Sequence, residues 1–182
     1  MPFAYYERLS PRKRAIYRRS AALRTLVVPE VEALVADVAA VEERLAAGRA
    51  RAVAFSCKRL LAGICEQLGV VPIGRMRVLA VRPSDATHEL HGLYERDEEG
   101  ETQITVWMRT AAHERIVAFR TFLRTVLHEL CHHLDYELYE LADSYHTEGF
   151  FARESSLMRQ LAPAPEPEPE LEATSVQLEL PW

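Results

Sequence analysis

The chain lacks the features that mark secreted or membrane-spanning proteins. Its 182 residues include only three cysteines, Cys57, Cys65 and Cys131, and no two of them have CxxC spacing. A disulfide framework is therefore not expected, and a reducing cytoplasm fits this composition. No apolar run approaches the roughly 18 residues of a membrane-spanning helix. The first residues, MPFAYYERLSPRKR, lack the apolar stretch of a signal peptide. We expect a cytoplasmic protein with no membrane partner.

Basic residues are missing from the last part of the chain. Residues 164–182 contain five glutamates and no Lys or Arg, so the other residues carry 22 acidic and 22 basic side chains although the net charge is -5. The segment APAPEPEPELEA is too rich in proline and charge to pack, which predicts a disordered tail over residues 163–182. Basic residues concentrate near the start, at Arg8, Arg12, Lys13, Arg14, Arg18, Arg19 and Arg24. We favour a solvated helix face there, with phosphate-backbone binding as the alternative.

The patterns in the first 69 residues predict a helical region, which we expect to pack on the part of the chain that carries the candidate catalytic residues described below. Ser10 followed by Pro11 is typical of a helix start, and this helix extends to about Leu26. A second helix is predicted from Pro29 to near Gly48. A third helix is predicted over residues 49–68, and Gly69 ends it.

Residues 76–109 predict strands instead. The expected strands are Met76–Arg82, Glu89–Arg96 and Thr102–Arg109, and a turn at residues 97–100 joins the last two as a hairpin. Ile104, Val106 and Met108 alternate with Gln103, Thr105 and Trp107, which is the pattern of a half-buried strand. Helical periodicity returns from about His113, and a last helix is expected over Thr147–Leu161. The fold class is therefore α+β, with a small antiparallel sheet of about three strands packed on a helix.

The segment HELCH, from His128 to His132, lies in the helical stretch TVLHELCHHLDY. Residues four apart on a helix project from one face, so both imidazoles can reach one tetrahedral Zn²⁺. Glu129 lies beside the first ligand, where a carboxylate can take a proton from zinc-bound water and return it to the leaving amine. The buried character of this helix opposes the alternative of solvated surface side chains. We predict a zinc centre with Glu129 as catalytic base.

A catalytic zinc needs a third protein ligand and an open fourth position. In metzincins a third His comes six residues after the second, where this chain has Leu138, so that class is excluded. His146 lies 14 residues beyond His132, which leaves room for the chain to reverse and start a new helix, and it is favoured because imidazole suits zinc better than a carboxylate here. Glu148 and Glu154 are the rival ligands.

Three neighbours of the predicted ligands have alternative interpretations. Asp135 lies on the ligand face, where it either orients an imidazole or is simply exposed. His133 points away from that face and is expected at the surface or behind a ligand. Cys131 faces the apolar side and is expected in the core rather than on zinc.

With these motifs the chain resembles the SprT-like (Spartan-type) zincin metallopeptidases over about residues 76–161. That family carries HExxH on a helix after a small sheet, then a third His in an H-G-x-x-F-like segment. HELCH matches, and His146 and Phe150 keep the spacing, although Thr147 replaces the Gly and no cysteine-rich zinc ribbon follows. The resemblance implies a zincin-like domain over residues 70–162 and a metalloprotease acting near DNA. It also implies that Thr102–Arg109 is the edge strand that binds substrate by β-augmentation, with Trp107 either lining the cleft or structural.

The last residues, QLELPW, resemble the bacterial sliding-clamp-binding peptide, whose pattern is Gln-Leu-x-Leu with an apolar or aromatic end. The matching residues are Gln177, Leu178, Leu180 and Trp182. A short motif on a disordered linker can reach a partner while the domain stays free. The alternatives are an apolar end that folds back on the domain and a chance match.

Three functions are compatible with these patterns. The leading one is a zinc endopeptidase that acts on protein substrates at DNA, in protein quality control or DNA–protein crosslink repair. The second is a regulatory protease that cleaves a repressor or antitoxin-type protein, a class that usually takes a downstream Glu as third ligand. The third is a non-catalytic, zinc-stabilised adaptor for DNA or the clamp.

Overall fold

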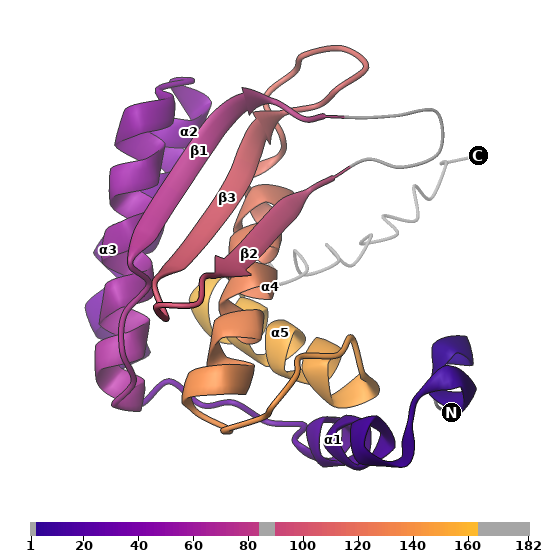
Figure 1. Ribbon diagram of the computed structural model, residues 1–182. Helices are drawn as coiled ribbons and strands as arrows, with labels where there is room; N and C mark the ends of the chain where they lie inside the picture. The colour runs from indigo at the N-terminus through magenta and orange to yellow at the C-terminus, as the bar shows by residue number, and fades with distance from the viewer. Residues whose placement is uncertain (1–2, 84–89, 164–182) are drawn as a thin grey trace, which may run out of the picture.

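The computed structural model describes residues 3–83 and 90–163 as an α+β fold (Figure 1). In chain order the elements are η1 (Ala4–Arg8), α1 (Pro11–Ala22), η2 (Val31–Leu34), α2 (Val35–Ala46), α3 (Ala50–Leu68), β1 (Arg75–Val81), β2 (Gly92–Arg96), β3 (Thr102–Arg109), α4 (Phe119–Glu137) and α5 (Glu148–Leu161), where η denotes a 3-10 helix. The predicted clamp-binding residues Gln177, Leu178, Leu180 and Trp182 lie outside the described residues. Within the described chain, no helix combines the length and apolar character needed to cross a membrane.

The N-terminal helices follow their capping residues. Ser10 caps α1 and Pro11 takes its first position, while Gly69 ends α3 in the left-handed conformation with φ 68°. α1 ends at Ala22, earlier than predicted. Leu23 is extended, with φ -82° and ψ 92°, and the Ser20 carbonyl accepts from the Leu23 N–H and from Arg153 of α5 instead of from the N–H four residues later.

The sheet is mixed, with strand order β1-β3-β2. β2 pairs antiparallel with β3, with Tyr94 opposite Ile104, as the predicted hairpin requires. β1 pairs parallel with β3, with Met76 opposite the same Ile104. The prediction of an antiparallel sheet is therefore wrong for β1. The chain reverses after β1 and again after β2, so β3 runs in the direction of β1 and inserts beside it.

β3 is the central strand, so the prediction that Thr102–Arg109 forms the free edge is also wrong. Ile104, Val106 and Met108 are at most 2% exposed and belong to the main core, and Trp107 on the other face is only 8% exposed. A central strand has neighbours on both sides, which is why the half-buried pattern is lost. Trp107 is therefore structural, and the edge beside α4 belongs to β2.

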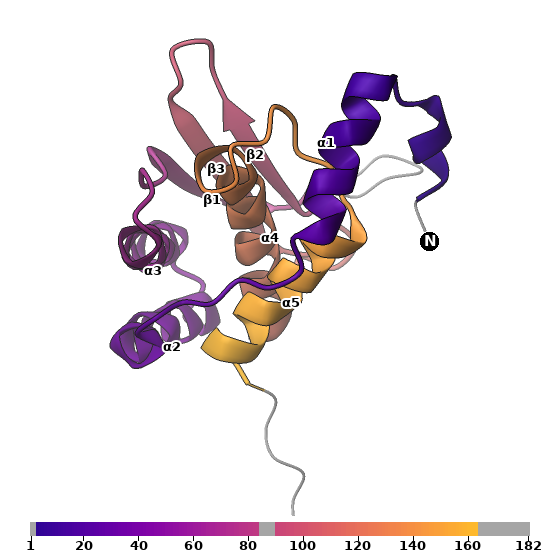
Figure 2. The same cartoon turned by 90° about the horizontal axis from the view of Figure 1, so that it is seen from below.

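Helices α2, α3, α4 and α5 lie on one side of the sheet, and α1 lies away from the strands beside α5 (Figures 1 and 2). α3 packs against β1, α4 packs against β2 and β3, and α5 packs across α4 and beside α1. In the middle of this arrangement α4 fully buries Leu123, Val126, Leu127 and Leu130. Burying each such side chain contributes roughly 1.5–3 kcal/mol. The apolar face of α4 is thereby fixed, and its other face carries polar side chains toward β2 and α5.

Candidate metal centre

Three histidine side chains converge between α4 and the loop that precedes α5. His128 and His132 project from α4 one turn apart, and His146 comes from the loop. The His146 Nε2 atom lies 2.9 Å from Nε2 of His128 and 3.0 Å from Nε2 of His132. The structure thus brings the three residues predicted as ligands together, in a cluster that could hold a metal ion.

A carboxylate from α5 orients the His128 ring. Glu154 Oε2 lies 2.9 Å from His128 Nδ1, and Glu154 Oε1 accepts a hydrogen bond from Arg124 Nη1 at 2.5 Å. Burial by itself raises the pKa of Glu154, but the hydrogen bonds from His128 and Arg124 lower it overall. The ionised Glu154 can only accept, so the His128 proton is on Nδ1. The Nε2 atom of His128 therefore presents a lone pair to the cluster.

A longer relay orients the His132 ring. His132 Nδ1 lies 2.7 Å from the Ser144 hydroxyl oxygen, and Ser144 donates its only proton to Asp135 Oδ2, also at 2.7 Å. The serine oxygen must then accept from His132, which places that proton on Nδ1. Asp135 is fully buried and paired with Arg153 of α5. Asp135 therefore supports an imidazole, as one interpretation predicted, and the alternative of an exposed residue is wrong.

The Nε2 lone pairs of His128 and His132 consequently face one point. His146 Nε2 can donate at most one proton, so in neutral rings one of its two close contacts would be lone pair against lone pair. A cation at the point of convergence removes this conflict. Tetrahedral zinc with Zn–N distances of about 2.0–2.1 Å holds ligand nitrogens roughly 3.3 Å apart. Here His146 Nε2 is 2.9 and 3.0 Å from the other two Nε2 atoms, and one ligand atom from each ring lies within 4.8 Å of the others. Three imidazoles are also a donor set that zinc favours.

Burial opposes a proton as the occupant of that point. The pKa of His132 is lowered to about 3, first by burial and then by His128 and His146. The pKa of His146 is also lowered, chiefly by burial. Neutral imidazole is the form that binds metal, so neither ring has to lose a proton near neutral pH.

Glu129 lies under the edge strand β2. Its side chain is 5% exposed, and burial raises its pKa to about 7 against the lowering effects of His128 and of the Tyr94 backbone N–H. A methyl group at Gly92 would collide with Glu129 Oε1 and Thr125 Cγ2, so a larger residue here would displace the Glu129 carboxyl from its place under β2. A carboxyl with a pKa near neutral can both accept and return a proton.

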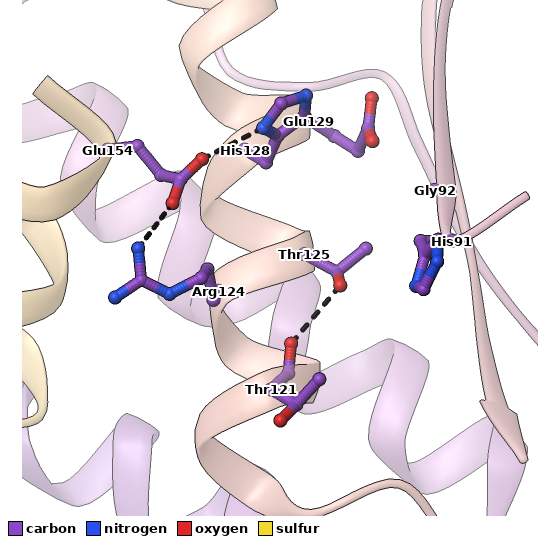
Figure 3. Close-up of a pocket in the computed structure, with 8 residues that line it drawn as sticks. All are labelled: His91, Gly92, Thr121, Arg124, Thr125, His128, Glu129 and Glu154. Atoms are coloured by element: carbon purple, nitrogen blue, oxygen red, sulfur yellow. Dashed lines mark hydrogen bonds and ion pairs between the residues drawn. The ribbon is translucent and has the colours of Figure 1, made fainter. Parts of the chain in front are cut away.

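A cleft passes over the histidine cluster beneath β2. One hollow of about 380 Å³ is lined by His91, Gly92, Thr121, Arg124, Thr125, His128, Glu129 and Glu154 (Figure 3). A second, of about 290 Å³, is lined by Gly92, Leu93, Tyr94, His128, Glu129, His132, Tyr136, Ser144 and His146. Gly92, His128 and Glu129 border both hollows, so the two lie next to each other on either side of these residues. In Figure 3 Arg124 turns toward Glu154, and His91 lies across the hollow from Thr125.

The rival ligands do not reach the cluster with a ligand atom. Glu148 Oε2 lies 3.4 Å from the Tyr17 hydroxyl, on the side of α1. Glu154 is near the cluster, but it contacts the Nδ1 atom of His128, behind the ring. His146 is therefore the third member of the group, and Glu154 contacts the candidate ligand His128 from behind.

Two further predictions concern the other side of α4. His133 is fully buried, so the predicted surface location is wrong, and its two ring nitrogens contact other residues rather than one of the three clustered imidazoles. Its Nε2 lies 2.7 Å from the Val71 carbonyl and its Nδ1 lies 3.2 Å from the Tyr94 hydroxyl, because β2 and the segment before β1 cover this face. Cys131 is 1% exposed and belongs to the core, as predicted.

Several supporting residues were not predicted. Ser144 and Arg153 carry no spacing signal, because their partners lie in other elements. Thr147 does carry one: it precedes a helix, and its hydroxyl accepts from the Phe150 N–H at 3.0 Å as the cap of α5. This cap accounts locally for a threonine where the resembled family has glycine.

Comparisons with known proteins add no relative to this description. No family model, curated protein or solved structure matches the chain. The geometry of the described residues is therefore what supports a function, and membership of the SprT-like family stays a prediction.

Proposed function

We propose that the chain is a zinc-dependent endopeptidase, with His128, His132 and His146 as metal ligands and Glu129 as catalytic base. The supporting observation is the convergence of two Nε2 lone pairs with His146 beside a buried carboxyl. Zn²⁺ bound by three imidazoles supplies a Lewis acid and a nucleophilic water at neutral pH. A zincin-like domain over residues 70–162, of SprT-like type, is part of this proposal.

The residues around the cluster have distinct roles in this reaction. Glu129 accepts a proton from the attacking water and gives it to the departing amine nitrogen. The exposed edge of β2 offers backbone groups that bind an extended peptide, and Gly92 brings that peptide close to Glu129. The hollow of about 380 Å³ next to Glu129 holds a substrate side chain. β2 thus replaces Thr102–Arg109 as the proposed substrate-binding strand.

His146 and Glu129 favour a zinc endopeptidase over the regulatory protease and the non-catalytic adaptor. Regulatory proteases of the repressor-cleaving type usually use a glutamate where this site has His146. A zinc-stabilised adaptor would need no buried carboxyl of raised pKa beside the metal, yet Glu129 is in that position. Both features support a hydrolase that takes three imidazole ligands.

Glu129→Gln separates catalysis from metal binding. The variant is expected to keep the zinc content of the wild type and to hydrolyse an unfolded protein such as casein about 10²–10⁴ times more slowly, because only the base is lost. His113→Ala, on an exposed loop, is the matched control and should change neither property. Equal hydrolysis by Glu129→Gln, or no hydrolysis by zinc-loaded wild type, would contradict the proposal.

Association with DNA is a separate proposal, supported by the exposed Arg12, Lys13 and Arg18 of α1. Replacing these three with Ala is expected to weaken binding to duplex DNA and to flatten its dependence on salt concentration. An unchanged salt slope would leave α1 as a solvated face.

Recruitment by a sliding clamp is proposed from the last residues of the chain alone. A peptide of residues 172–182 should bind a purified bacterial clamp, and Gln177→Ala with Leu180→Ala should abolish binding. Absence of binding at high micromolar peptide would end this proposal.

A further inference from the structure

The segment before α1 touches the loop that carries the third histidine. Tyr5 of η1 donates its hydroxyl proton to the His146 backbone carbonyl at 2.9 Å. The Tyr5 ring also stacks on Tyr145, with centroids 6.5 Å apart, and meets the edge of Tyr17 of α1 at 5.9 Å. A residue near the start of the chain therefore holds the backbone of a candidate ligand 141 positions later.

The C-terminal end of α1 contacts the next residues of the same loop. The Ser20 and Thr147 hydroxyls lie 3.1 Å apart, and both residues are fully buried. Gly149 fits against the last carbonyls of α1, where a methyl group would collide with the Ser20 carbonyl oxygen. Both contacts fix the start of α5, immediately after His146.

α1 also connects to the second histidine. Arg153 of α5 donates from Nη1 to the Ser20 and Leu23 carbonyls at the end of α1, at 3.1 and 2.5 Å. Its Nη2 pairs with Asp135, the carboxylate that accepts from Ser144 behind His132. The arginine thus joins the carbonyl end of a helix, where a cation is favoured, to the relay of a candidate ligand.

These polar contacts hold α1 in place together with the buried Tyr17 ring, which packs on Tyr5, Tyr6 and Tyr145. Only Tyr17 and Ser20 are buried on this helix, and the main hydrophobic cluster of the described residues contains no α1 side chain. A helix without a share in the core would contribute little as a scaffold. Its two buried hydroxyls instead face the segment that follows His146: Ser20 meets Thr147, and Tyr17 lies 3.4 Å from the Glu148 carboxylate.

We propose that η1 and α1 form part of the metal centre: Tyr5 and Ser20 are positioning residues that hold the His146 loop, so docking of α1 and binding of zinc strengthen each other. The inference rests on the proposed zinc site. Linkage makes the effect reciprocal, since contacts that favour the metal-bound loop are favoured by the metal in turn.

Chelator competition with full-length protein measures how the contacts of η1 and α1 affect zinc affinity. Tyr5→Phe and Ser20→Ala are each expected to weaken zinc affinity about two- to tenfold, the worth of one hydrogen bond. Tyr6→Phe is the matched control, because the Tyr6 hydroxyl accepts from Arg18 within the same segment and leaves the loop untouched. The thermal midpoint of the metal-free protein should differ little between Tyr5→Phe and Tyr6→Phe.

Limited trypsin digestion measures the reverse direction. Zinc should slow cleavage after the exposed Arg12, Lys13 and Arg18 of α1 in wild type, and less so in Tyr5→Phe. Cleavage after Arg115, on an exposed loop away from α1, is the internal reference and should not respond to zinc.

The outcomes separate this inference from the proposed function. If wild type binds no zinc, the metal site itself fails. If wild type binds zinc and Tyr5→Phe and Ser20→Ala match Tyr6→Phe in affinity, the inference is overturned and the metal site stands. Weaker affinity in Tyr5→Phe and Ser20→Ala together with zinc-dependent protection of α1 supports it.

Discussion

The two candidate ligands on α4 are supported by the same chemistry in different surroundings. Behind His128 is the pair Glu154–Arg124, in which the glutamate side chain is 6% exposed but the arginine side chain is 49% exposed and reaches water. Behind His132, beyond Ser144, is the pair Asp135–Arg153, in which both side chains are 0% exposed. Exposed ion pairs contribute little to stability, whereas a buried pair is costly to break from one side. One relay can therefore vary without loss of the fold, and the other cannot.

The largest predicted difference follows from removing each carboxylate. Asp135→Ala leaves Arg153 charged and buried and is expected to destabilise the metal-free protein by about 3–5 kcal/mol. Glu154→Ala leaves Arg124 free to turn to water and is expected to cost about 1 kcal/mol. Urea unfolding with zinc chelated measures both. Equal losses would mean that exposure does not distinguish the two relays.

Glu129 extends the comparison, because burial raises the pKa of this carboxyl to about 7. Ionising Glu129 therefore lowers the stability of the folded protein. This destabilisation is absent below about pH 4.5 and is fully present above about pH 7. Glu129→Gln is expected to stabilise the metal-free protein by about 1–3 kcal/mol at pH 8 and not at pH 4. Urea midpoints at the two pH values measure this. A variant no more stable than wild type at pH 8 would contradict it.

Zinc affinity should respond to both relays alike, although stability does not. Ser144→Ala and Glu154→Ala each release an imidazole Nδ1 and are expected to weaken zinc binding about tenfold, the usual effect of losing a partner behind a ligand. Competition with a chromogenic chelator gives the two constants. If zinc affinity falls in only one of the two variants, the hydrogen bonds removed in the other variant serve the fold and not the metal.

The smallest effect is expected for the exposed arginine. Arg124→Ala should cost less than about 1 kcal/mol, and 1 M salt should lower wild-type stability toward that of the variant. Unfolding in low and high salt measures this. A loss as large as that of Asp135→Ala would place Arg124 among the buried contacts instead.

Local patterns predicted one half of the site. The four-residue spacing of His128 and His132 needs only a helix, and α4 supplies it. The hairpin of β2 and β3 followed from the turn at residues 97–100, and the helix after His146 from its periodicity. Each of these depends on residues close together in the chain.

Long-range contacts escaped prediction. Alternation in Ile104, Val106 and Met108 shows two faces of a strand but not its neighbours, so the parallel β1 and the central place of β3 were missed. Arg153 meets carbonyls of α1 about 130 residues earlier. No spacing rule connects positions that only tertiary packing brings together.

Metal stoichiometry tests the central claim most directly. Wild type and His113→Ala, purified without chelator and dialysed, are expected to retain one zinc per chain by atomic emission. His128→Ala, His132→Ala and His146→Ala, folded as judged by circular dichroism, are expected to retain almost none. A wild type without zinc, or a folded His146→Ala variant with a full equivalent, would contradict the three-histidine centre.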